Sequence, residues 1–178
     1  MSTSSEIRNL RLLVVGGRPA SVQILRTAFS LLGMRSVTVV AESDKAIDAL
    51  RSQHFSAIFA DAGAEPVGRM TFVRAARRSK GLLNPMTPLF VIYTNARQKH
   101  VEYARDEGVT DVLTHPVSAA TIQRKLEVAL GAPRPFIAAP SFFGPDRRTE
   151  RRNVWSGDER RKRLAKKTKI VLPDAPVA

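Results

Sequence analysis

Two short stretches late in the chain have the same order of side chains that can bind anions and planar rings. Each has an aromatic residue, a glycine, an acid and two neighbouring arginines, and the two stretches are offset by thirteen residues. The matching residues are Phe142 and Trp155, Gly144 and Gly157, Asp146 and Glu159, and Arg147-Arg148 and Arg160-Arg161. The sequence therefore predicts two short sites that share one chemistry.

The side chains of this repeat fit a small anionic guanine nucleotide better than a plain phosphate. A guanidinium group fits a phosphate or the O6/N7 edge of guanine, and an aromatic ring gives a stacking face. A carboxylate accepts from guanine N1–H and N2–H, which adenine does not present, and glycine lets the backbone come close. The expected ligand-binding residues are Phe142, Gly144, Asp146, Arg147, Arg148, Arg151, Arg152, Trp155, Gly157, Glu159, Arg160, Arg161 and Arg163.

The composition favours an anionic partner and excludes several kinds of site. The 178 residues include 29 Lys and Arg against 16 Asp and Glu, a net charge of +13, and residues 131–178 hold 12 of the basic and 5 of the acidic ones. Such a charge is typical of proteins that bind nucleotides, nucleic acids or lipid surfaces. The chain has no cysteine and its three histidines are dispersed, so we expect no metal site. No apolar run approaches the ~20 residues of a membrane span, so we expect a cytoplasmic protein without membrane insertion.

Apolar runs typical of strands alternate with helical patterns five times before the composition changes. The predicted strands cover residues 10–15, 37–41, 57–60, 88–93 and 111–114. The predicted helices lie near 22–32, after a Ser43 cap, from Gly68 through 76, over 97–107 and over 121–130. This alternation predicts an α/β fold, a (βα)5 doubly wound parallel sheet with the flavodoxin-like order 2-1-3-4-5. The loops at the carboxyl ends of its strands would bring together Gly16, Gly17, Asp61, Thr94 and His115.

The remaining segments are expected to be extended or unstructured. Residues 1–9 are predicted to be a disordered N-terminus, and 132–140 a linker rich in proline. Residues 141–166 form the arginine-rich nucleotide-binding tail, and 167–178 are a C-terminal extension. The basic tail has few apolar residues, so we expect it to be largely unstructured and to order when it binds its ligand.

Residues 10–131 resemble the receiver domain of response regulators, of the CheY-like type. The resemblance rests on the run Leu12–Pro19, on Asp61 after the third strand, on Thr94 after the fourth and on His115-Pro116 after the fifth. It implies a site in which an aspartate accepts a phosphoryl group with the help of Mg²⁺.

The chain departs from this family at the residues that perform the chemistry. Gly16 and Gly17 replace the acidic pair that holds Mg²⁺ in receivers, and His115 replaces the lysine that contacts the phosphoryl group. Val112 stands where the family has an aromatic residue that rotates on activation. We therefore expect a degenerate receiver, in which Asp61 is a turn residue rather than a phosphoacceptor.

The combination with an arginine-rich tail resembles the CheY-like cyclic di-GMP effectors, the Cle proteins. The resemblance implies that the tail binds cyclic di-GMP, including as an intercalated dimer. It also implies that the body engages a protein such as the flagellar motor switch or a signalling kinase, with recruitment to the flagellated cell pole. Arg147 and Arg151, like Arg148 and Arg152, have the R-x-x-x-R spacing of other binders of this messenger.

The sequence thus predicts a ligand-sensing adaptor rather than an enzyme, with two alternatives. One is a phosphorylation-dependent response regulator of a two-component system, against which Gly16 and Gly17 argue. The other is a non-specific nucleic-acid-binding protein. The acids of the tail would repel the phosphates of a nucleic acid; they are Asp146, Glu150, Asp158 and Glu159.

Overall fold

Five short apolar segments pair as parallel strands in the computed structural model, which describes residues 7–16, 18–63, 66–147 and 169–171. The strands are β1 (Arg11–Val15), β2 (Ser36–Val40), β3 (Ala57–Gly63), β4 (Leu89–Tyr93) and β5 (Asp111–Thr114). Their order in the sheet is β2-β1-β3-β4-β5. The predicted fold class and strand order are therefore confirmed.

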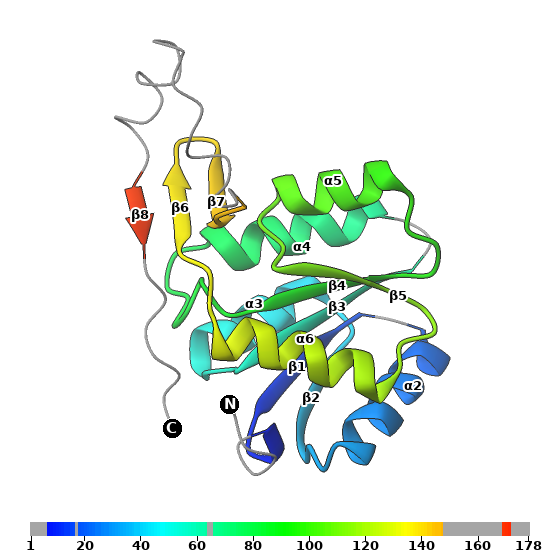
Figure 1. Cartoon of the computed structure of the whole chain (residues 1–178). Helices are drawn as coiled ribbons and strands as arrows, with labels where there is room; N and C mark the ends of the chain where they lie inside the picture. The colour runs from blue at the N-terminus through cyan, green and yellow to red at the C-terminus, as the bar shows by residue number, and fades with distance from the viewer. Residues whose placement is uncertain (1–6, 17, 64–65, 148–168, 172–178) are drawn as a thin grey trace.

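Helices cover both faces of this sheet (Figure 1). They are α2 (Pro19–Leu31), α3 (Ser43–Ser52), α4 (Pro66–Arg78), α5 (Gln98–Asp106) and α6 (Ala119–Gly131). Successive strand residues point to opposite faces. On one face Leu12 joins an apolar cluster with Leu25 of α2 and Ile122 of α6. On the other face Leu13 joins a second cluster with Ile47 of α3 and with side chains of α4.

Several predicted boundaries shift by a few residues. The residue before α3 is Glu42 and makes no side-chain capping bond, so the predicted cap at Ser43 is wrong. Ser118 does cap α6, because its hydroxyl accepts from the Thr121 N–H at 3.1 Å. Helix α4 begins at Pro66, earlier than predicted, since proline suits the first turn of a helix. Strand β3 continues to Gly63, which pairs with Tyr93 after a shift in register.

The segment after α6 differs from the expected linker and free tail. Strand β6 (Phe136–Ala139) pairs antiparallel with β7 (Phe142–Pro145), leaving a two-residue loop at Pro140 and Ser141. Strand β8 (Lys169–Val171) pairs with the other edge of β6, and Figure 1 shows β7 next to α4 and β8 at the outer edge of the three strands. The apolar run of β6 meets the two phenylalanines of β7, which gives a hairpin enough apolar surface to pack on the body.

The beginning of the described chain also belongs to the body. Ile7 is only 6% exposed and lies in the same apolar cluster as Leu12. The predicted disorder of residues 1–9 is therefore wrong at Ile7, while residues 1–6 lie outside the described residues. Within the described ranges, no helix is both long enough and apolar enough to cross a membrane.

Arg77 of α4 connects the hairpin to the body through a buried cation. Its Nε donates to the Gly108 carbonyl oxygen at 2.9 Å, and Nη1 donates to the carbonyl oxygens of Pro85 and Thr87, each at 2.7 Å. The guanidinium lies over the Phe136 ring, 5.2 Å from its centroid. Burial lowers the pKa of Arg77 to about 9. Because its acceptors come from separate segments, Arg77 fixes them relative to one another.

Replacing Arg77 should therefore destabilise the whole fold. Arg77→Met keeps much of the apolar volume but leaves buried carbonyl groups without a donor, at about 1–3 kcal/mol each. Removal of a buried charge offsets part of this cost. We expect a net loss of about 2–3 kcal/mol in the free energy of unfolding, measured by urea denaturation. The matched control Arg124→Met, at an exposed arginine of α6, should stay within about 0.5 kcal/mol of wild type. Equal stability of the two variants would contradict the role given to Arg77.

Candidate functional site

The carboxyl ends of β3 and β5 bring Asp61 and His115 together, as the sequence predicts. Asp61 is buried, and its Oδ1 accepts from the Gly63 N–H at 2.9 Å. His115 Nε2 lies 3.9 Å from the same oxygen. Asp61 was expected to end β3, but the strand continues through it to Gly63. The carboxylate therefore binds the backbone two residues further along the chain, a contact typical of an aspartate in a turn.

His115 is enclosed in a place where receivers have a lysine. Its side chain is 12% exposed, and neither ring nitrogen has a hydrogen-bond partner among the described residues. Its backbone N–H donates to the Tyr93 carbonyl oxygen at 2.9 Å, and its peptide bond to Pro116 is cis. An imidazole ring whose nitrogens have no hydrogen-bond partner in the described structure therefore faces Asp61.

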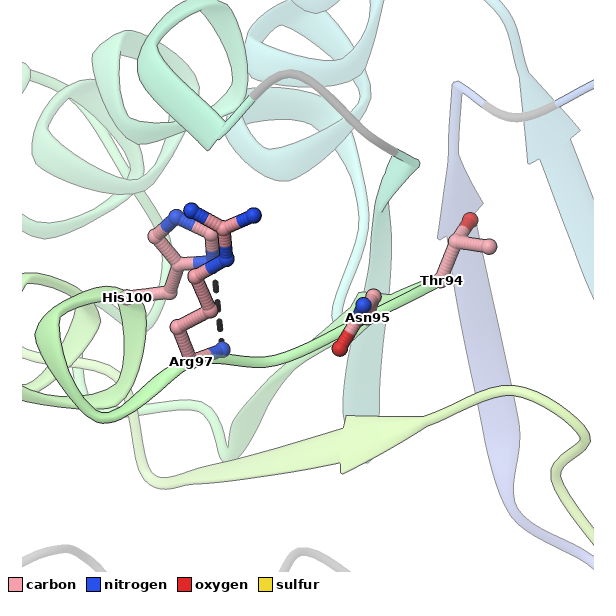
Figure 2. A pocket seen from close by; sticks show the side chains of 4 residues that line it. All are labelled: Thr94, Asn95, Arg97 and His100. Atoms are coloured by element: carbon pink, nitrogen blue, oxygen red, sulfur yellow. Dashed lines mark hydrogen bonds between the residues drawn. The ribbon is translucent and has the colours of Figure 1, made fainter.

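A hollow of about 340 Å³ lies at the end of β4. It is lined by Thr94, Asn95, Arg97 and His100 (Figure 2). The Arg97 backbone N–H donates to His100 Nδ1 at 3.3 Å, which leaves the proton of a neutral imidazole on Nε2. Arg18 reaches the rim, where its Nη2 lies 3.4 Å from Thr94 Oγ1. These donors and cations suit an anion and do not suit Mg²⁺.

Sequence reasoning found only part of this crevice. Thr94 was expected there, whereas Arg18, Arg97 and His100 were not singled out. The available signal was the position of Arg18 and Arg97, each a few residues beyond the end of an apolar strand. Gly16 lies at the end of β1 with φ 68° and donates to the Val40 carbonyl oxygen at 2.7 Å. Gly17 lies outside the described residues.

Among the predicted ligand-binding residues, the structure describes Phe142, Gly144, Asp146 and Arg147. The others lie outside the described residues; they are Arg148, Arg151, Arg152, Trp155, Gly157, Glu159, Arg160, Arg161 and Arg163. Gly144 is buried, and a Cβ atom there would lie 2.6 Å from the Gly108 Cα. Close packing on the body therefore explains why residue 144 is a glycine, without any contact to a ligand.

Phe142 and Arg147 form a stacked pair at the end of the hairpin. The Arg147 guanidinium lies 5.4 Å from the centroid of the Phe142 ring. Arg147 Nη1 is 3.5 Å from Asp106 Oδ1 at the end of α5, whereas Nη2 is buried without a hydrogen-bond partner in the described structure. Burial lowers the pKa of Arg147, the Asp106 carboxylate opposes this shift, and the positive charges of Arg105 and Arg134 add to it. The charges of Arg105, Arg134 and Asp106 therefore all influence the guanidinium of Arg147.

Asp146 lies at the point where the chain leaves the hairpin. Its backbone N–H donates to the Pro135 carbonyl oxygen at 2.7 Å, and the residue takes part in a further interaction. Asp146 is half-buried. The first copy of the repeat is thus attached to the body rather than free in solution.

The glycine contact between body and hairpin can be tested directly. Gly108 has φ 92°, and a Cβ atom there would collide with the Phe143 carbonyl oxygen. Gly108→Ala should cost about 2 kcal/mol of stability, because it adds both backbone strain and overpacking. Amide hydrogen exchange should also become faster over residues 136–145. Gly131→Ala is the matched control, since a Cβ atom there meets nothing within 4 Å; we expect it to be neutral or stabilising by up to about 1 kcal/mol. Similar effects of the two changes would rule out the proposed contact.

Parallel strands in the order β2-β1-β3-β4-β5, with Asp61, Thr94 and His115-Pro116 at their carboxyl ends, define a receiver-like protein. No protein-family model matches the chain. Among solved structures, the receiver domain of the sensor histidine kinase PA1611 from Pseudomonas aeruginosa has a magnesium ion in its active-site cleft. It is 25% identical with a TM-score of 0.56, over 69% of this chain and 98% of that chain.

Two further neighbours give the same fold. Chemotaxis protein CheY4 of Vibrio cholerae is 19% identical with a TM-score of 0.57, over 66% of this chain and 96% of that one. The receiver domain of an HD domain-containing protein from Pseudomonas fluorescens is 18% identical with a TM-score of 0.58, over 70% and 96%. The chain therefore has a CheY-like receiver fold and extends beyond it.

We expect that acetyl phosphate with Mg²⁺ does not phosphorylate this protein. The metal would meet Gly16, Gly17 and Asp61, which together offer one carboxylate where receivers offer three. The measurement is phosphate-affinity electrophoresis or mass spectrometry, with Asp61→Asn as the blank. Gly17→Asp restores one potential ligand and should give some labelling if the metal site alone is missing. A stable acyl phosphate on wild-type Asp61 would contradict this expectation.

Proposed function

We propose that this protein is a signalling adaptor that binds cyclic di-GMP through its arginine-rich segment and does not work by phosphorylation. The stacked pair of Phe142 and Arg147 is the observation on which this proposal rests. The same pairing of an aromatic residue with arginine recurs in sequence at Trp155 and Arg160. A stacking face next to a guanidinium is what binding of a base with an attached phosphate requires.

The number and charge of these groups favour cyclic di-GMP over a mononucleotide. This ligand has two guanines and two phosphates, and the sequence repeat supplies two aromatic residues and two pairs of arginines. Charge-assisted and bidentate bonds from arginine to phosphate are among the stronger polar contacts in proteins. An intercalated dimer of the ligand would use more of these arginines at once.

The crevice supports a role without phosphoryl transfer. Gly16 and Gly17 offer no carboxylate for Mg²⁺, and His115 faces Asp61 in place of a lysine. The scaffold is therefore better suited to docking on another protein. Receiver-fold neighbours belong to sensor kinases and chemotaxis proteins. We propose a cytoplasmic adaptor whose target is a protein such as the flagellar motor switch or a signalling kinase, with recruitment to the flagellated pole.

Calorimetric titration of the full chain with cyclic di-GMP and cyclic di-AMP tests this function. We expect a preference for cyclic di-GMP of more than about tenfold, which needs only about 1.4 kcal/mol, less than one good base-edge contact. Arg147→Ala and Arg160→Ala should each weaken binding of both nucleotides, because they remove stacking and phosphate contacts. The exposed Arg124 gives the control variant Arg124→Ala, which should leave both affinities unchanged.

A non-specific polycation would give a different result. It would bind the two nucleotides equally, and its affinity would fall steeply with salt because counterions are released. Equal affinities, together with an equal loss from Arg124→Ala and Arg160→Ala, would therefore overturn the proposed function.

A further inference from the structure

Helix α5 brings an exposed acid to the stacked pair of the first copy. Asp106, the last residue of α5, has a side chain that is 78% exposed, and its Oδ1 lies 3.5 Å from Arg147 Nη1. Arg147 itself is 30% exposed, and its guanidinium carbon lies over the Phe142 ring, 5.4 Å from the centroid. A solvent-exposed carboxylate therefore lies next to a partly exposed guanidinium group.

Contacts between the hairpin and the body hold Phe142 and Arg147 next to Asp106. Gly144 packs against Gly108, two residues after Asp106 in the chain. The Arg78 side chain donates to the Ser141 carbonyl oxygen in the hairpin loop, and Arg77 covers the Phe136 ring. Phe142 and Arg147 are thus fixed relative to the end of α5 before any ligand binds. Such pre-organisation lowers the entropic cost of binding.

The chemistry of the arrangement suits a guanine base. A purine can stack on the outer face of the guanidinium, which would complete a layer of phenylalanine, arginine and base. A carboxylate beside that layer can accept from guanine N1–H and N2–H, and adenine has no such pair of donors on that edge. Arg105 and Arg134 are both exposed, and their charges act on Arg147. Their positive charges would attract a phosphate attached to the stacked base.

Asp146, the acid expected from the sequence, is less suited to this role. It is half-buried at the base of the hairpin, and the residue already takes part in another interaction. Its backbone is fixed by the bond to the Pro135 carbonyl oxygen. Asp106 is more exposed, and its Oδ1 lies 3.5 Å from Arg147 Nη1.

We propose that Asp106 of α5, with Phe142 and Arg147, forms a composite guanine site between the receiver body and the first copy, where Asp106 accepts from the base edge. Arg105 and Arg134 bind the adjoining phosphate. This inference rests on the proposed function, and it assigns to the body a direct part in selecting the nucleotide.

The test measures the affinity of full-length variants for cyclic di-GMP and for cyclic di-AMP. The quantity compared between variants is the ratio of the affinity for cyclic di-GMP to the affinity for cyclic di-AMP. Asp106→Asn should lower the ratio by about tenfold, the effect of one base-edge contact, while the affinity for cyclic di-AMP changes little. Arg134→Ala should weaken the binding of both nucleotides and leave the ratio of the two affinities unchanged. The control is Glu102→Gln, one turn earlier on α5, where an exposed acid accepts from Gln98 Nε2 at 2.8 Å; it should change neither value.

The outcomes separate this site from the proposed function. If Asp106→Asn weakens the binding of both nucleotides equally, Asp106 only supports Arg147 and the proposal is wrong. If Asp146→Asn lowers the ratio and Asp106→Asn does not, the proposal is also wrong, although the protein still binds cyclic di-GMP. If the wild type binds neither nucleotide, the proposed function fails and this inference fails with it.

Discussion

The structure depends on a buried cation that has carbonyl groups, not a carboxylate, as its acceptors. A buried guanidinium costs several kcal/mol unless its N–H groups are satisfied. Arg77 meets this requirement with carbonyl oxygens from the α4–β4 loop and from Gly108, and with the Phe136 ring of β6. Each of these segments must be in place for the others to be stable. The hairpin is therefore part of the folded body, and the boundary expected at residue 131 does not mark the end of the core.

Helix α5 connects the hollow at the end of β4 with the hairpin. Arg97, the residue before the helix, and His100 in its first turn line the hollow, and its last residue, Asp106, contacts Arg147. A helix of nine residues is about 14 Å long. The receiver-like sheet and helices are present, while Arg18 and Arg97 lie at the carboxyl ends of its strands, where their charges would favour an anion.

The sequence was informative where structure is determined locally. Apolar runs and helical spacing predicted the sheet and its order, because these patterns repeat within a few residues. The hairpin was missed since its prolines are typical of a linker, and its strands are stabilised by α4 and Gly108, which lie far away in sequence. Gly144 was predicted as a ligand residue although its partner is Gly108. Arg77 and Asp106 carry no motif, so only their position in the folded chain distinguishes them from other charged helix residues.

The two copies of the repeat cannot have equivalent surroundings, although their sequences match. Gly108 has room for one glycine, and Gly144 already occupies that place. The contact of Asp106 with Arg147 likewise serves the first copy. The two sequences share the aromatic ring, the arginines and an acid. In the proposed function, stacking and phosphate binding would therefore be common to the two copies, whereas the contacts with Gly108 and Asp106 belong to the first.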